Sequence, residues 1–253
     1  VLWQTTVPGE VVASPAVEDG RVVVLTTSGR LMALDTDEGK LQWTLSEEQP
    51  PLTLRSASTP VITNGAVLYG RADGKVGIAL LSNGQPVRQS KVADPRGATE
   101  LDRMVDVDAR PLIAGDELYA IAYNGQLMAR KLMTGDEVWK RKYSGYRDMA
   151  VTGNAIVLTD SRSHLFAVDR RNGLELWSNT QLENRTVTAP VVLGDYVVVG
   201  DVEGYLYWLD RTDGSIKAMQ QLDSSGLYAA PLVDGDTLYV QSRGGKLYAI
   251  KRP

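Results

Sequence analysis

The chain has 253 residues, of which 43% are hydrophobic and 23% charged, as is typical of a globular protein. Its formal net charge of −4 lacks the basic field that phosphate backbones attract, so we expect no nucleic-acid partner. Cysteine is absent, which excludes disulfides, thiolate zinc sites and thiol nucleophiles and fits either the cytosol or a periplasm. No apolar run reaches the roughly 18 residues of a membrane span.

One short pattern recurs along the chain: an Ala, an Asp two residues later, a Gly four residues after that, and a Trp four residues further on. It is complete at residues 33–43 and 167–177, and residues 129–139 carry Lys131 in the Asp position. Weaker copies place Arg88 or Ala218 in the Trp position, and a half-copy lies at residues 247–250. Such self-similarity is the mark of a repeat architecture.

A second signal precedes each copy: a residue that starts a short apolar run, a turn with Gly, and another apolar run. The starting residues are Pro15, Pro60, Pro111, Met149, Pro190 and Pro231. Together the signals define six units of four short strands, in the first unit at about 13–17, 21–26, 31–35 and 40–45. Four strands in roughly 40 residues predict an all-β fold, a β-propeller of four-stranded antiparallel blades, as a single domain over residues 1–253.

The two ends of the chain leave two interpretations open. The last unit has no fourth strand, whereas residues 1–4 resemble a fourth strand with no unit before it. Six repeats could therefore close into a ring by sharing one blade between the termini. Alternatively, the chain is a fragment of a longer propeller.

The repeated residues have structural explanations. The Asp can accept backbone N–H bonds in the turn after the third strand, and the following Gly supplies a positive φ. The tryptophan can cover the small Ala of its own or the next blade, with its indole N–H donating to a carbonyl. We therefore assign a structural docking role, and no ligand cage, to four tryptophans: Trp3, Trp43, Trp139 and Trp177.

Departures from the repeat are where function is expected in such folds. The interval between third strands is longest in two neighbouring units, and both insertions precede an inner strand, at about 46–58 and 89–110. Strands that alternate up and down place such connections on one face, so we expect the two loops side by side. The first holds Leu52, Leu54 and Arg55, and the second holds Asp106 and Asp108. These residues form either a protein-binding patch or a bland surface in which the leucines tuck under their own loops.

No catalytic, metal or cofactor motif emerges. The sole histidine, His164, lies in a turn, where we expect it to be solvated, and no nucleophile accompanies it. The acidic residues Asp106 and Asp108 lack the spacing of a calcium loop, and there is no Gly-rich phosphate loop. The sequence thus predicts a scaffold without catalytic residues, metal or cofactor.

The repeat resembles the tryptophan-docking motif of the quinoprotein (PQQ-dehydrogenase-like) propeller superfamily. Within it, the chain is similar to the BamB family of outer-membrane assembly lipoproteins. The most specific segments are residues 52–55, 99–108, 122–125, 200–206 and 223–226. This resemblance implies an eight-bladed propeller at the periplasmic face of the bacterial outer membrane. Its partners would be the BAM complex, through the POTRA domains of BamA, and unfolded outer-membrane protein clients.

The resemblance also implies which residues bind BamA: Leu52, Leu54, Arg55, Asp106 and Asp108. We expect one aspartate to pair with Arg55 and the other to face outward. The family's lipidated N-terminal cysteine and about two blades have no counterpart here, so the chain is expected to be truncated and any membrane anchor to lie outside it. Two alternatives remain: a quinoprotein dehydrogenase that uses PQQ and Ca²⁺, and a ligand-sensing receptor ectodomain.

Overall fold

All 253 residues are described in the computed structural model, and every regular element in it is a β-strand. The strands form two compact units, Val1–Tyr146 and Arg147–Pro253. No helix with the length and hydropathy of a membrane span is present.

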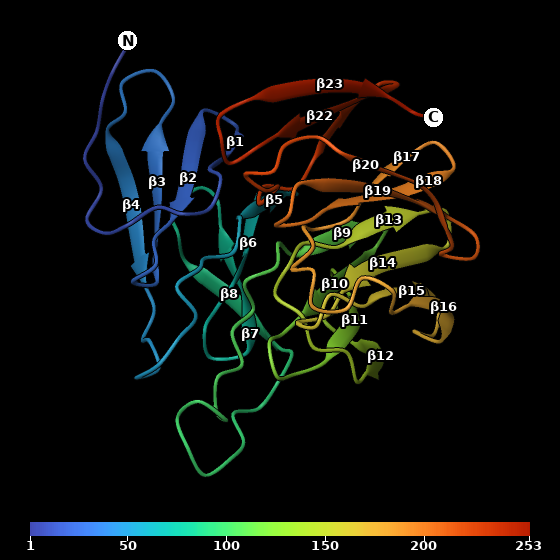
Figure 1. The fold of residues 1–253 in the computed structure, drawn as a ribbon. Helices are drawn as coiled ribbons and strands as arrows, with labels where there is room; N and C mark the ends of the chain where they lie inside the picture. The colour runs from blue at the N-terminus through green and yellow to red at the C-terminus, as the bar shows by residue number, and fades with distance from the viewer. The chain divides into compact units, whose positions relative to one another are not determined.

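The first unit contains three four-stranded sheets (Figure 1). The first sheet is built from β1 (Ala16–Glu18), β2 (Arg21–Leu25), β3 (Arg30–Asp35) and β4 (Leu41–Ser46). The second sheet is built from β5 (Val61–Thr63), β6 (Ala66–Gly70), β7 (Lys75–Leu80) and β8 (Pro86–Lys91). The third sheet is built from β9 (Leu112–Ala114), β10 (Glu117–Ile121), β11 (Leu127–Lys131) and β12 (Glu137–Arg141).

The second unit contains two four-stranded sheets and one three-stranded sheet. The first is built from β13 (Ala150–Thr152), β14 (Ala155–Thr159), β15 (Leu165–Asp169) and β16 (Glu175–Asn179). The second is built from β17 (Val191–Leu193), β18 (Tyr196–Gly200), β19 (Tyr205–Asp210) and β20 (Ile216–Gln221). The third is built from β21 (Leu232–Asp234), β22 (Thr237–Gln241) and β23 (Leu247–Lys251).

Within each sheet, every strand pairs antiparallel with the next strand along the chain, as the six predicted units require. The first strand begins later than predicted, at Ala16, which pairs with Val23. Pro15 precedes it and has no N–H to donate, so the ladder cannot continue through that residue. The final sheet has no fourth strand, as the sequence predicts.

The hairpin between the third and fourth strands shows why the Asp and Gly recur. In the first sheet, Oδ1 of Asp35 accepts hydrogen bonds from the backbone N–H groups of Asp37 (2.8 Å) and Glu38 (3.0 Å). Gly39 then has a φ of 65°, a left-handed conformation that favours glycine. The register shifts between Ala33 and Leu34, which leaves Trp43 directly opposite Ala33.

Tryptophans of the outer strands pack against the neighbouring sheet. The indole Nε1 of Trp43 donates to the carbonyl of Leu81 at 2.8 Å, and Trp177 donates to that of Arg211 at 3.0 Å. A Cβ on Gly84 would lie 2.5 Å from a ring atom of Trp43, so this glycine makes room for the indole. Within each unit, these contacts join sheets through a buried core rich in Val and Leu.

Trp3 and Trp139 occupy comparable positions. Trp3 precedes the first strand, and its Nε1 donates to the carbonyl of Thr36 at 2.7 Å. Trp139 is buried opposite Ala129, with its ring centroid 6.0 Å from that of Tyr119. All four tryptophans assigned to docking therefore lie against protein atoms.

Candidate functional site

The two long loops of the first unit contact each other. One spans residues 47–60, between β4 and β5, and the other spans residues 92–111, between β8 and β9. The backbone N–H of Leu54 donates to Oδ1 of Asp106 at 2.9 Å, and Oγ of Ser58 donates to the carbonyl of Ala109 at 3.2 Å. The side-by-side arrangement predicted from the sequence is therefore present.

The second loop returns to the body of the unit as a buried segment, residues 104–109. The N–H of Val107 donates to the carbonyl of Arg71 at 3.0 Å, and the carbonyl of Asp106 accepts from the N–H of Tyr123 at 2.9 Å. Gly70 lies so close that a Cβ there would be 1.8 Å from the carbonyl oxygen of Val107. These contacts fix the segment, and with it the direction of both aspartates.

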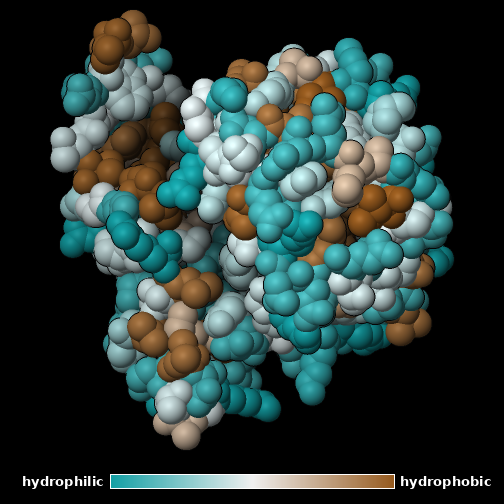
Figure 2. All heavy atoms as spheres, in the orientation of Figure 1, coloured by the Kyte–Doolittle hydropathy of each residue, from teal (hydrophilic) through white to brown (hydrophobic).

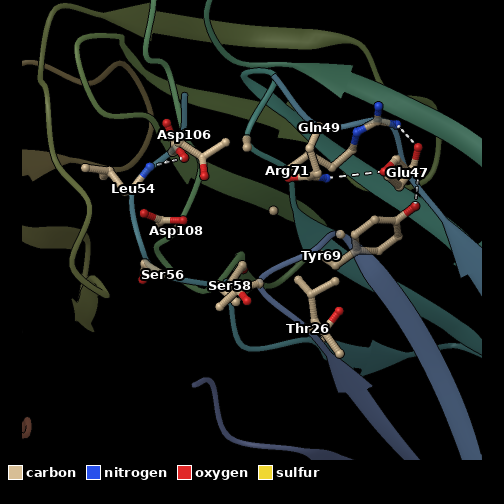
Figure 3. Close-up of a pocket in the computed structure, with 17 residues that line it drawn as sticks. Thr26, Glu47, Gln49, Leu54, Ser56, Ser58, Tyr69, Arg71, Asp106 and Asp108 are labelled. Carbon is tan, nitrogen blue, oxygen red and sulfur yellow. Dashed lines mark hydrogen bonds and ion pairs between the residues drawn. The ribbon is translucent and has the colours of Figure 1, made fainter. Parts of the chain in front are cut away.

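The root of the first loop is held by a cluster of charged side chains (Figure 3). Glu47 accepts a hydrogen bond from the hydroxyl of Tyr69 at 2.5 Å and forms an ion pair with Arg71 at 2.7 Å. The side chains of Arg71 and Glu47 are only 9% and 14% exposed, and Arg71 also pairs with Asp73 at 2.9 Å. The pKa of Tyr69 lies above its usual range, mainly because the hydroxyl is buried and secondly because it donates a hydrogen bond to Glu47.

A small pocket lies between the loops, lined by Leu54, Ser56, Ser58, Asp106 and Asp108 among others (Figure 3). Its volume of about 30 Å³ is enough for water but not for an organic cofactor. The Oδ2 atoms of both aspartates are buried and have no hydrogen-bond partner. A buried carboxylate oxygen that accepts no hydrogen bond favours the protonated, neutral form of the carboxyl group.

Burial changes the titration of both aspartates. It raises the pKa of Asp106, an effect that the hydrogen bond from the N–H of Leu54 opposes. Burial and the nearby charge of Asp106 raise the pKa of Asp108 to about 7. Asp108 therefore titrates close to neutral pH, far above the usual range of an aspartate.

The outward part of the first loop presents one leucine and one arginine. Leu52 is 41% exposed, whereas Leu54 is half-buried beside the pocket. The side chain of Arg55 is 83% exposed and pairs with Glu10 at 3.0 Å. In Figure 2, a few hydrophobic residues show at the lower left of the view, where Figure 1 draws the blue loop 47–60 and the green loop 92–111.

The expected pairing of Arg55 with an aspartate is wrong, and neither aspartate is exposed: Asp106 is buried and Asp108 is half-buried at the pocket. Asp106 is 1% exposed and accepts from the backbone of Leu54, and Arg55 pairs instead with Glu10. The physical reason is the return of residues 104–109 into the unit, which buries side chains on both sides of the segment. Sequence spacing placed both aspartates on one side but did not indicate which side.

Four residues that hold the loop escaped the sequence analysis: Glu10, Glu47, Tyr69 and Arg71. One signal existed for Arg71. In two blades of the second unit the same turn position holds an aspartate, Asp160 in one and Asp201 in the other. Each of these carboxylates accepts hydrogen bonds from backbone N–H groups of its own turn. An arginine cannot accept these bonds, so the change of charge indicates a different role.

His164 is also placed differently from the expectation. Its side chain is only 12% exposed, and Nδ1 lies 2.9 Å from Oδ2 of Asp160. Asp160 also accepts the backbone N–H groups of Arg162 and His164, so the same carboxylate orders the turn and contacts the ring. No group of three or more His, Asp or Glu side chains in the chain is arranged to hold a metal ion.

Comparisons with known proteins agree with this architecture. The family described as outer membrane protein assembly factor BamB matches residues 1–179 and 175–252. The chain belongs to this family. The BamB of Shewanella oneidensis is 46% identical over 192 residues, which cover 76% of this chain and 49% of the relative. The BamB of Vibrio cholerae is 46% identical over 187 residues, which cover 74% of this chain and 48% of the relative.

A solved structure supports the same family and gives the fold. The crystal structure of BamB from Moraxella catarrhalis is 27% identical, with a TM-score of 0.94 over 99% of this chain and 75% of the other. The fold is thus the β-propeller of four-stranded antiparallel blades that the repeats predict. Relatives in the BamB family are named as assembly factors, which favours the scaffold interpretation over the dehydrogenase. The chain spans about half the length of the curated relatives it matches.

Proposed function

We propose that this chain is part of a non-catalytic scaffold of the outer-membrane protein assembly machinery, at the periplasmic face of the membrane. In this proposal it binds the POTRA domains of BamA through the loop surface, which we define as Leu52, Leu54 and Arg55. The observation that carries the proposal is that Leu52 and Arg55 are exposed on a loop whose backbone is fixed by a hydrogen bond to Asp106. Membership of the BamB family supports the choice of partner.

The loop surface is prepared for binding before a partner arrives. Glu47 holds the root of the loop, Asp106 holds the backbone of Leu54, and Ser58 holds the end. A loop that is already ordered loses less conformational entropy on association, so more of its contact energy remains for affinity. Full burial of an exposed leucine then contributes at most about 1.5–3 kcal/mol.

The two aspartates have different roles in this proposal. Asp106 is too buried to reach a partner, so it acts as a positioning residue through the N–H of Leu54. Asp108 is more exposed than Asp106 and lines the same pocket. A basic group of the partner near Asp108 would favour its ionised form, and binding would then release a proton near neutral pH.

The test measures binding of purified BamA POTRA domains to this chain by calorimetry. We expect Arg55→Ala and Leu52→Glu each to weaken binding at least tenfold, and Leu54→Ala to weaken it by a smaller factor. Matched controls come from the same unit: Arg96→Ala removes an arginine that is 86% exposed, and Leu41→Glu changes a leucine that is 55% exposed. The controls should bind like the wild type.

Asp106→Ala separates positioning from direct contact. It should weaken binding as much as Leu54→Ala while leaving Leu52 and Arg55 unchanged, because the loop loses an anchor and not a contact. The proposal fails if Arg55→Ala, Leu52→Glu and Asp106→Ala all fold and bind the POTRA domains as tightly as the wild type.

A further inference from the structure

The seam between the second and third sheets replaces the docking tryptophan with an arginine. Arg88 stands opposite Ile78, in the register that Trp43 holds opposite Ala33 in the sheet before it. Its Nη2 donates to the carbonyl of Leu132 at 2.6 Å and its Nη1 to that of Met133 at 3.0 Å. The guanidinium thus makes the carbonyl contact that the indole of Trp43 makes in the first seam.

The arginine also covers the same glycine position. A Cβ on Gly135 would lie 2.8 Å from Nη1 of Arg88, just as one on Gly84 would meet the ring of Trp43. A guanidinium is smaller than an indole, however, and its hydrocarbon stem is narrower. The replacement therefore keeps the hydrogen bond to a carbonyl but covers less of the apolar surface around it.

Beside Arg88 lies a pocket of about 380 Å³, within the range of small-ligand sites. Leu68, Ile78 and Leu132 are 1%, 7% and 9% exposed and form its buried wall. Its rim is apolar too, because Leu80 stands where the repeat has Asp and is 36% exposed. Exposed Val87 and Met133 complete the rim, at 58% and 74%.

Arg88 gives the pocket a charge that nothing in the chain balances. Both of its hydrogen-bond acceptors are neutral backbone carbonyls, and its buried Nε has no hydrogen-bond partner. By contrast, Arg71, Arg130 and Arg171 in comparable turns and strands each pair with a carboxylate. A half-buried cation beside an apolar cavity favours a ligand that has both an apolar body and an anionic group.

We propose that this pocket, which we call the Arg88 pocket, binds an aromatic side chain of a partner polypeptide. A carboxylate of the same polypeptide lies next to the aromatic ring. The aromatic ring lies against the apolar wall of the pocket, beside Arg88, and the carboxylate pairs with the guanidinium. The pocket borders β8, the outermost strand of its sheet, whose free edge is open to an extended peptide. This site is separate from the loop surface and does not depend on it.

The probe pair is N-acetyl-tryptophan, an indole with a carboxylate, and N-acetyl-tryptophanamide, the same indole without the charge. Binding is followed by the methyl NMR signal of Met133, assigned with Met133→Leu. We expect the acid to shift this signal with at least fivefold higher affinity than the amide. The methyl of Met219, which is 64% exposed on the second unit, serves as the internal control and should not shift.

Two variants test the origin of the pocket. Arg88→Trp restores the residue of the repeat, so it should fold with a melting temperature at least equal to the wild type and bind neither probe. Leu80→Asp places the aspartate of the repeat at the rim of the pocket and should weaken binding of N-acetyl-tryptophan at least fivefold. Unchanged binding in Arg88→Trp, or equal affinity for acid and amide, would overturn the proposal. A Met133 shift that depends on protein concentration alone would identify a second copy as the occupant and would overturn it as well.

Discussion

Equivalent turns in the two units bury charged residues for opposite purposes. In the second unit, Asp201 is 0% exposed; it accepts the backbone N–H groups of Glu203 and Tyr205 and the hydroxyl of Tyr207. In the first unit the same position is Arg71, which pairs with Asp73 of its own turn and also reaches out of the turn to Glu47. A buried charged group that bonds within its own turn stabilises one blade. A buried charged group that pairs with a neighbouring segment also holds that segment in place at the surface.

The acidic pocket of the first unit extends this contrast. Both carboxylate oxygens of Asp201 accept hydrogen bonds, from two backbone N–H groups and one hydroxyl. By contrast, Oδ2 of Asp106 and Oδ2 of Asp108 have no hydrogen-bond partner in the protein. Natural proteins leave few buried polar atoms unpaired, and those that remain are often found at functional positions. The first unit therefore holds its loop surface over two buried carboxyl oxygens that no protein group satisfies.

The largest expected effect is at the self-contained turn. Asp201→Ala leaves two backbone N–H groups and the hydroxyl of Tyr207 without their acceptor, at about 1–3 kcal/mol each. The free energy of unfolding in urea should fall by about 5 kcal/mol. Asp201→Asn keeps one acceptor oxygen and should lose less than half as much. An Asp201→Ala protein within about 1 kcal/mol of the wild type would contradict this view of the turn.

A second prediction concerns the unpaired acid and pH. The pKa of Asp108 in the folded chain is about 7, above its ordinary value of 3.8, so the folded state binds this proton more tightly than the unfolded state. Stability from Asp108 is thus complete below about pH 4 and is lost as pH rises through 7. Asp108→Asn, which mimics the protonated form, should be more stable than the wild type at pH 8, by at most about 4 kcal/mol.

The pH dependence of that difference is the measurement. Urea unfolding of wild type and Asp108→Asn from pH 4 to pH 8 should give curves that diverge as pH rises. Asp116→Asn is the control, because the ion pair with Lys131 lowers the pKa of Asp116 and reverses the sign. Parallel curves for wild type and Asp108→Asn would show that Asp108 is solvated, contrary to its position in the pocket.

The smallest effect on stability is expected at Arg71. Arg71→Met removes the ion pairs to Glu47 and Asp73 and should lower the free energy of unfolding by about 2 kcal/mol. Its effect on the loop should be more visible, because the Glu47 side chain at the root is then held only by the hydrogen bond from Tyr69. Trypsin should then cleave after Arg55 several times faster, as read by mass spectrometry. Arg96→Met should leave that rate unchanged, and an unchanged rate in Arg71→Met would refute the anchoring role.

The sequence by itself determined the repeating hairpins. An Asp that accepts turn N–H groups, a Gly with positive φ and a Trp opposite Ala are local requirements, so their spacing is visible along the chain. The same spacing revealed the two long loops and the replacement of Trp by Arg88. The first strand was misplaced by a few residues because the pattern did not weigh the missing N–H of Pro15.

Only the tertiary structure decided where side chains point and which distant residues meet. Alternation placed Asp106 and Asp108 on one side of their segment, but the hydrogen bond from Val107 to the carbonyl of Arg71 holds the segment against the unit and buries both of its sides. The pairing of Arg55 with Glu10 joins residues 45 positions apart, for which no local pattern exists. Local chemistry therefore determined the blades, whereas packing between segments determined the loop surface and the Arg88 pocket.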